Sequence, residues 1–153
     1  IFIAGSGVSV DAVISDFISG AVEALAPENK ENHWDIIEGQ GSLFHPSYAG
    51  VTAGLIHGSQ PDALVLCHEP TRTHMRGLPH YPIPSLNDCM KLSKEVASLT
   101  NPEARFVGIA VNTKAMDEGI AEQYLKETSD KFQIPCVDPI RTGVADVVDQ
   151  FAM

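Results

Sequence analysis

Two nearly uninterrupted apolar runs constrain the fold of this chain more than any other feature. Residues 62–68 read Asp-Ala-Leu-Val-Leu-Cys-His, and residues 105–111 read Arg-Phe-Val-Gly-Ile-Ala-Val. Buried parallel strands have this composition. Segments with helical periodicity separate these runs from each other and from a shorter run at 134–137. The alternation predicts an α/β fold with a mostly parallel sheet and helices on both faces.

A fourth strand is predicted at 34–38, where an apolar pair leads into Glu38. The strands should then end at Glu38, His68, Asn112 and Val137, and in a parallel sheet these ends share one edge, where open α/β sheets place their sites. Ser9 can cap the first helix. The predicted helices cover residues 9–25, 49–57, 85–99, 117–132 and 143–151.

Bulk properties limit the class of protein. At 153 residues the chain is expected to be a single α/β domain, and its opening on Ile1 without a Met suggests a fragment of a longer chain. A net charge of −10 argues against a nucleic-acid surface, and no apolar run approaches the roughly 20 residues of a membrane span. The three cysteines have neither disulfide nor zinc spacing, which favours reduced thiols and a cytoplasmic protein.

The loop after residue 38 is rich in glycine and polar groups. Glycine has no Cβ, so a phosphate or another ligand can approach the backbone there. Glu38 is a candidate Mg²⁺ ligand or a base acting on an amine; a solvated Glu in an ordinary turn is the alternative. His45 is a second candidate catalytic group. The predicted substrate-binding residues of this loop are Gly39, Gln40, Gly41, Ser42 and Tyr48.

A second set of candidate residues follows the strand at 62–68. His68 can accept a proton from a substrate amine near pH 7, or it can simply hydrogen-bond the loop backbone. Arg72 and Arg76 lie four residues apart in a proline-rich loop over 69–84. Two guanidinium groups suit a dicarboxylate or a phosphate, although solvated loop charges are an equal alternative.

Two later strand ends complete the predicted site. Asn112 follows the strand at 105–111 and can either read the edge of a nucleotide base or cap the next turn. Asp138 follows the last strand, and Arg141 comes three residues later. Arg141 can bind a substrate anion or pair with Asp138.

Several of these segments resemble known enzymes. Residues 36–42, Ile-Ile-Glu-Gly-Gln-Gly-Ser, resemble a segment of dethiobiotin synthetase and the cobyrinate amide synthases. More closely, residues 38–48, 57–64, 112–113 and 138–141 resemble one bacterial and archaeal family. That family was long catalogued as a domain of unknown function and is associated with D-glutamate N-acetyltransferase activity. The resemblance covers nearly the whole chain.

The resemblance implies a P-loop NTPase-like fold and an enzyme that moves acetyl from acetyl-CoA, as co-substrate, to the amino group of D-glutamate. It implies a cofactor-binding role for Asn112, the counterpart of an adenine-reading Asn, and we expect Asp138 to share that role. An ATP- and Mg²⁺-dependent ligase is the alternative, with Glu38 on the metal. A third alternative is that this chain is only a scaffold half, with catalysis in the missing part of the protein.

The chain departs from the expected pattern, because no Gly-x-x-x-x-Gly-Lys-Ser/Thr loop occurs in it. We therefore expect its amino-terminal phosphate-loop unit to be missing. We expect the protein to be a homo-oligomer that binds a small-molecule substrate and neither nucleic acid nor a membrane.

Overall fold

The structure is a computed structural model that describes residues 7–30 and 32–152. The chain divides into two compact units. The first comprises Ile1–Pro61 and Lys91–Glu103, and the second comprises Asp62–Met90 and Ala104–Met153. Helix α3 (Leu86–Ser98) belongs to both, and its first turn is capped by the Ser85 hydroxyl, which accepts the N–H of Asp88 at 3.1 Å.

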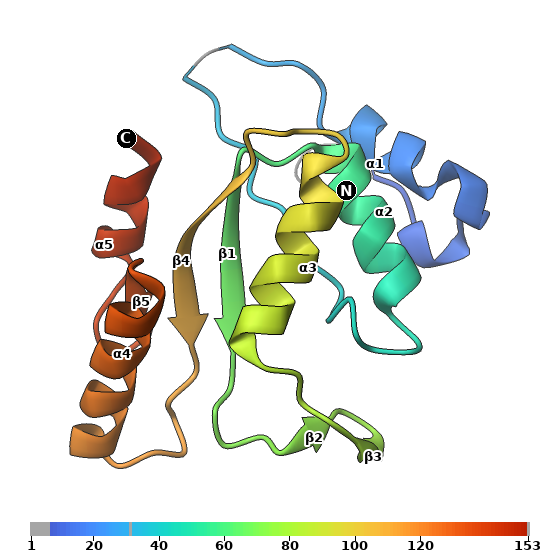
Figure 1. The fold of residues 1–153 in the computed structure, drawn as a ribbon. Helices are drawn as coiled ribbons and strands as arrows, with labels where there is room; N and C mark the ends of the chain where they lie inside the picture. The colour runs from blue at the N-terminus through green and yellow to red at the C-terminus, as the bar shows by residue number, and fades with distance from the viewer. Residues whose placement is uncertain (1–6, 31, 153) are drawn as a thin grey trace. The chain divides into compact units, whose positions relative to one another are not determined.

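A parallel sheet forms the centre of the second unit. Strands β1 (Ala63–His68), β4 (Arg105–Val111) and β5 (Cys136–Val137) pair in the order β1-β4-β5 (Figure 1). All pairs are parallel, with His68 opposite Val111 and Ala110 opposite Val137. The prediction is confirmed for these three strands, and their carboxyl ends share one edge of the sheet.

Helices α4 (Glu118–Phe132) and α5 (Ala145–Val148) cover opposite faces of this sheet. Leu125 of α4 packs with Ile109 and Val111, whereas Val147 of α5 packs with Val107. Neighbouring residues of a strand point to opposite faces. The register shifts at Val107, which has no partner on β1, so Val107 and Gly108 both face α5. A Cβ on Gly108 would lie 2.6 Å from Val147 Cγ2, so glycine lets α5 approach closely.

A short antiparallel hairpin lies within the segment 69–84, which had been predicted as an irregular loop. Its strands are β2 (His74–Met75) and β3 (Leu78–Pro82), joined through Gly77 at φ +75°. Met75 is buried. The prolines did not indicate a hairpin, because proline removes a ladder donor and is tolerated only at strand edges.

Two short 3₁₀ turns and two helices begin the first unit. The turns are Val10–Ala12 and Ser15–Phe17, followed by α1 (Ile18–Leu25), and α2 spans Ala49–Ser59. The predicted helix over 9–25 is therefore wrong in its first half, and Ser9 makes no side-chain cap. Val13 and Ile14 have extended backbones there. Both are β-branched, which restricts χ1 and lowers helix propensity.

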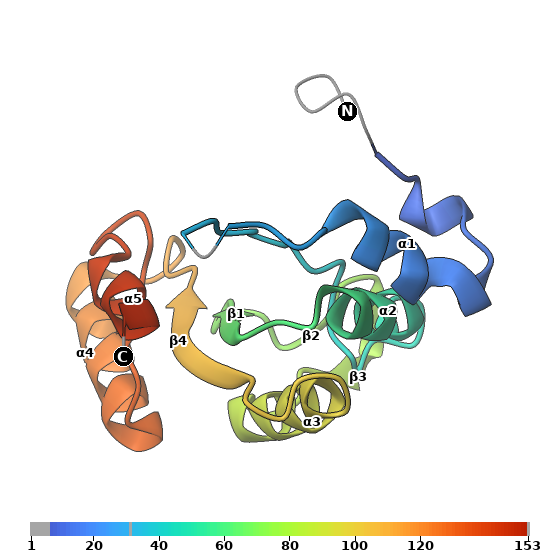
Figure 2. The same cartoon turned by 90° about the horizontal axis from the view of Figure 1, so that it is seen from above.

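Helices α1 and α2 lie side by side (Figure 2). The contact depends on glycines, because a Cβ on Gly54 would overlap the Ile18 side chain and a Cβ on Gly58 would overlap the carbonyl oxygen of Ser19. Gly50, Gly54 and Gly58 recur every fourth residue and so share one helix face. This spacing is a sequence signal for close helix packing that the strand and helix prediction did not use.

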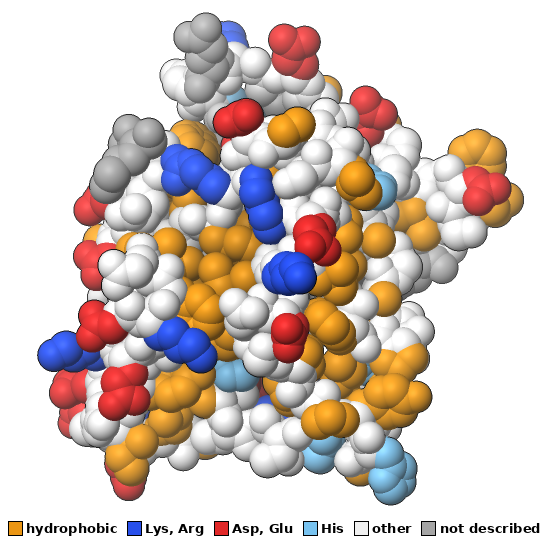
Figure 3. Space-filling model, viewed as in Figure 1, with side chains coloured by type: hydrophobic (Ala, Val, Ile, Leu, Met, Phe, Trp, Pro, Cys, Tyr) orange, Lys and Arg blue, Asp and Glu red, His pale blue; other side chains and the backbone are white. Residues whose placement is uncertain are grey.

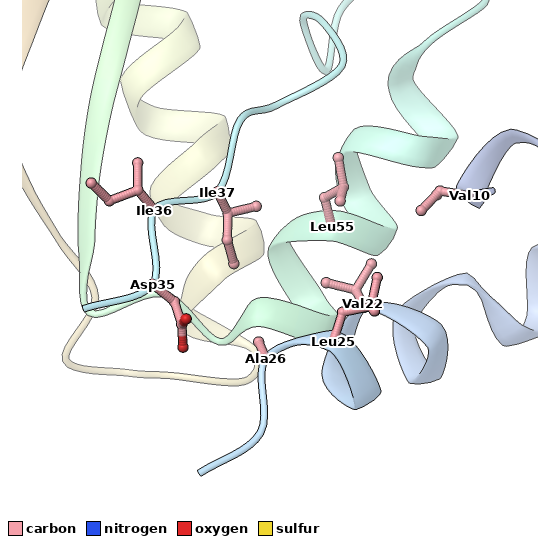
Figure 4. A pocket seen from close by; sticks show the side chains of 8 residues that line it. All are labelled: Val10, Val22, Leu25, Ala26, Asp35, Ile36, Ile37 and Leu55. Carbon is pink, nitrogen blue, oxygen red and sulfur yellow. The ribbon is translucent and has the colours of Figure 1, made fainter. Parts of the chain in front are cut away.

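The predicted strand at 34–38 is wrong. These residues form neither strand nor helix, and they are exposed, with Ile36 at 96%. A strand is stable only where its N–H and C=O groups find a ladder partner, and the described residues provide none here. Ile36 and Ile37 instead border a hollow of about 240 Å³ beside Val22 and Leu55 (Figure 4).

Within the described residues, no helix is long and apolar enough to cross a membrane. Figure 3 shows Lys and Arg side chains lying among Asp and Glu on this face rather than gathering in a basic patch.

Candidate active site at the carboxyl edge of the sheet

A pocket of about 260 Å³ lies at the carboxyl ends of β1, β4 and β5. Three of the predicted site residues, His68, Asn112 and Asp138, line it together. Its remaining lining is mostly apolar: Cys67, Ala110, Val111, Pro139 and Ile140. Such an edge is where open α/β sheets bind ligands, and an apolar wall with a few polar groups is typical of a small-molecule site.

His68 ends β1 and is half-buried beside Tyr124 of α4, with 6.4 Å between the two ring centroids. Burial lowers the pKa of His68 below its usual 6.5; Glu69 raises it and Arg72 lowers it further. The imidazole is therefore neutral at pH 7 and able to accept a proton.

Asn112 joins two strand ends. Its backbone N–H donates to the carbonyl of His68 at 2.8 Å, and its Oδ1 accepts the N–H of Lys114 at 3.1 Å. The second bond caps the turn after β4, which is one of the two roles that the sequence left open. This turn engages only Oδ1 of Asn112 and not the Nδ2 donors of its amide.

Asp138 is 4% exposed, and protein donors surround its carboxylate. Oδ2 accepts both the hydroxyl and the backbone N–H of Thr113, and Oδ1 accepts the N–H groups of Ile140 at 2.9 Å and Arg141 at 3.2 Å. Burial alone raises the pKa of Asp138, but these hydrogen bonds outweigh it and lower the pKa from 3.8 to about 2. The carboxylate is therefore charged at any physiological pH.

Arg141 binds backbone rather than a carboxylate. Its Nη2 donates to the carbonyl oxygens of Met116 at 2.9 Å and of Thr113 at 3.5 Å. Among the described side chains no Arg141–Asp138 ion pair forms; their contact is through the Arg141 N–H. A substrate role for Arg141 stays a prediction.

The two arginines of the segment 69–84 differ in setting. Arg72 pairs with Glu69 at 2.5 Å, and both side chains are partly exposed. Arg76 is exposed in the turn between β2 and β3. An exposed ion pair contributes little to stability, so a ligand carboxylate can displace Glu69 at small cost. The predicted clamp remains a prediction for both arginines.

The predicted residues of the first unit lie in a loop before α2. Glu38, Gly39 and Gln40 are exposed. Within the residues that the structure describes, no group of three or more His, Cys, Asp or Glu side chains is arranged to hold a metal. A Mg²⁺ ion at Glu38 would therefore take most of its other oxygens from water and substrate.

His45 is buried at 7% exposure within this loop, and its ring lies 4.3 Å from that of Tyr48. Its Nδ1 accepts the N–H of Ser47 at 3.1 Å. This bond places the lone pair on Nδ1 and the ring proton on Nε2. A catalytic role for His45 stays a prediction.

The loop containing these residues is fastened to α2. Thr52 Oγ1 donates to the Gly41 carbonyl at 2.9 Å, and the Ser42 hydroxyl accepts the N–H of Phe44 at 3.1 Å. A Cβ on Gly41 would lie 3.2 Å from Tyr48 Cβ, so glycine lets the loop fold closely on this ring.

Thr113 is the residue of the edge that the sequence prediction missed. It is fully buried and holds Asp138. Its sequence signals were its place directly after Asn112 and its part in the family resemblance over 112–113. Neither indicated the bond to Asp138, because a Thr at a strand end usually caps a turn.

The fold is that of an α/β protein with a pocket at the carboxyl ends of parallel strands. The family model described as a domain of unknown function (DUF1611_C), P-loop domain, matches residues 1–148, and the chain belongs to this family.

Curated relatives and a solved structure match nearly the whole chain. The chain is 54% identical over 152 residues to a protein named D-glutamate N-acetyltransferase from Tritonibacter scottomollicae. This match covers 99% of this chain and 46% of the relative. A protein of the same name from a Pseudoalteromonas species is 55% identical over 148 residues. This match covers 97% of this chain and 45% of the relative. A crystal structure of a DUF1611 family protein from Anabaena variabilis superposes with a TM-score of 0.83 at 41% identity. The superposition covers 99% of this chain and 45% of that protein's chain. The chain thus spans about half the length of the relatives it matches.

Proposed function

We propose that the protein containing this chain transfers acetyl from acetyl-CoA to the amino group of D-glutamate. The observation that supports this best is identity of 54% and 55%, over nearly the whole chain, to two proteins that bear that name. The pocket at the sheet edge adds a chemical argument, because it combines a neutral imidazole with an apolar wall and an amide.

His68 is the proposed general base. The α-ammonium of glutamate must lose a proton before its nitrogen attacks the thioester carbonyl, and the neutral imidazole takes that proton. A C–N bond then forms and the C–S bond breaks. The thiolate of coenzyme A leaves and takes the second proton from the nitrogen, and the imidazolium releases the first proton to solvent. The lowered pKa of His68 keeps the base unprotonated at the start of the cycle.

The edge pocket is the proposed place for the acetyl-pantetheine end of the acyl donor, because the thioester must reach His68. Its wall combines Pro139 and Ile140 with the amide of Asn112, and Ile140 is 94% exposed. The pantetheine chain would cover that exposed side chain, and the Nδ2 donors of Asn112 suit one of its amide carbonyls. Asp138 contributes to this site through the loop that it holds.

The acceptor carries two carboxylates, for which Arg72, Arg76 and Arg141 are the proposed partners. The loop groups Gly39, Gln40, Gly41, Ser42 and Tyr48 are proposed to contact substrate, and His45 is proposed as a second catalytic group. Glu38 remains the candidate Mg²⁺ ligand, although acetyl transfer itself consumes no ATP and needs no metal.

One assay tests the function and its alternative. Full-length protein is incubated with acetyl-CoA and either D- or L-glutamate, with and without ATP and Mg²⁺, and free coenzyme A thiol is measured. We expect thiol release with D-glutamate that is independent of ATP. Release that requires ATP would favour the ligase, and absence of release with D-glutamate would reject the acetyltransferase.

A further inference from the structure

The loops after β4 and β5 are tied together by one buried pair. Thr113, at 0% exposure, gives both its hydroxyl and its N–H to Oδ2 of Asp138, at 4% exposure. The charge of Asp138 makes both of these bonds charge-assisted, and they are shielded from water. The two loops are therefore fixed to each other at this point.

Further bonds close the loop after β5. The Thr142 hydroxyl accepts the N–H of Asp138 at 3.1 Å, and the Thr142 N–H donates to the Asp138 carbonyl at 2.8 Å. Arg141 reaches back to the carbonyl of Met116 in the other loop at 2.9 Å. The conformation of this short segment is thus determined by polar bonds, since Pro139, Ile140 and Arg141 are all exposed.

Each partner of the buried pair is adjacent in sequence to pocket-lining residues. Asn112 precedes Thr113, and Pro139 and Ile140 follow Asp138. Oδ1 of Asp138 also binds the Ile140 N–H directly, at 2.9 Å. Because the Ile140 side chain is 94% exposed, packing does not hold it, and its position depends on the backbone that Asp138 holds.

We propose that Thr113 and Asp138 are positioning residues of the acyl-donor site, which hold Asn112 and Ile140 at the spacing that the acyl donor requires. This inference rests on the proposed function for the identity of the ligand. The pair acts before the ligand arrives: preorganised loops spare the ordering cost of binding.

The test compares variants of the full-length protein by calorimetric titration with coenzyme A and by steady-state kinetics. Thr113→Val keeps the shape and removes the hydroxyl, and Thr113→Ser is the matched control that keeps it. We expect Thr113→Val to weaken coenzyme A binding by about tenfold, as loss of one buried hydrogen bond to a charge implies, and Thr113→Ser to stay within about twofold. The KM for acetyl-CoA should rise in parallel, while kcat and the KM for D-glutamate stay nearly constant.

Unchanged coenzyme A affinity in a folded Thr113→Val protein would overturn the proposal, and so would a fall in kcat and melting temperature with no change in affinity. If Thr113→Val does not fold, Thr142→Ala at an exposed position replaces it, with an expected loss of about threefold.

The outcomes separate this inference from the proposed function. Coenzyme A binding that depends on Thr113, without acetyl transfer to D-glutamate, would reject the function and support the positioning role. Acetyl transfer to D-glutamate with no dependence on Thr113 would support the function and reject the positioning role. A full-length wild-type protein that does not bind coenzyme A would reject both.

Discussion

The hydroxyl and the backbone N–H of Thr113 both donate to the same oxygen of Asp138, although the two residues lie 25 positions apart. Two donors on one buried oxygen stabilise the charged form of that carboxylate. The folded state therefore depends on Asp138 being ionised, and this dependence has a measurable consequence at low pH.

Asp138 should contribute acid-sensitive stability. Its folded pKa of about 2 lies below the ordinary 3.8, so its contribution is fully present above about pH 4 and is lost as the pH falls toward 2. Asp138→Asn should lower the free energy of unfolding by about 1–3 kcal/mol at pH 7, because buried donors lose a charged acceptor. Denaturant unfolding at pH 7 and pH 3 should show this difference narrowing; an equal difference at both values would contradict the assignment.

His68 should control the acidic limb of the rate profile. Burial lowers its pKa below 6.5. As the pH decreases, kcat/KM should therefore still be constant at pH 6.5 and should fall only at more acidic pH, where the imidazole gains a proton. His68→Gln should reduce kcat by about 10²–10⁴-fold and remove that limb. His33→Gln, at an exposed position in the first unit, is the control. A variant at His68 with a normal rate would exclude it as the base.

Arg72 should act on the acceptor alone. Arg72→Lys keeps the charge and loses the forked donors, so the KM for D-glutamate should rise by a factor that corresponds to about 1–3 kcal/mol. The same holds for Arg76→Lys. Steady-state kinetics with each substrate varied in turn provides the measurement. Equal effects on the KM for acetyl-CoA would instead indicate contacts with the donor.

The helix pair α1 and α2 should tolerate no side chain at Gly58. A Cβ there would overlap the Ser19 carbonyl, so Gly58→Ala should destabilise the protein by about 1–3 kcal/mol despite the better helix propensity of alanine. Gly50→Ala is the matched control, because nothing lies within 4 Å of its Cβ position, and it should stabilise by up to about 1 kcal/mol. Thermal unfolding of both variants decides; similar shifts would contradict the packing argument.

Cys67 should report on occupancy of the edge pocket. It is exposed and lines the pocket, whereas burial raises the pKa of Cys136 to about 11 and also raises that of Cys89. The thiolate is the reactive form, so iodoacetamide should label Cys67 first. Coenzyme A should slow this labelling, as peptide mass analysis would show. Labelling of Cys67 that is insensitive to coenzyme A would place the donor elsewhere.

The sequence by itself determined the parallel sheet and which residues lie at its carboxyl edge. The apolar runs that became β1 and β4 have the composition of parallel strands, and the crossover rule then puts His68, Asn112 and Asp138 at one edge. These properties follow from residue periodicity and chain connectivity, which are local or topological and can be read along the chain.

Only the tertiary structure decided what the side chains at that edge do. Asp138 was predicted to bind cofactor, yet its oxygens are taken up by Thr113, Ile140 and Arg141, because donors distant in sequence meet there. Residues 34–38 have the composition of a strand but lack a ladder partner among the described residues, and composition cannot supply one. Hydrogen-bond partners and strand neighbours are properties of three-dimensional proximity, and a single sequence does not specify which distant groups satisfy each other.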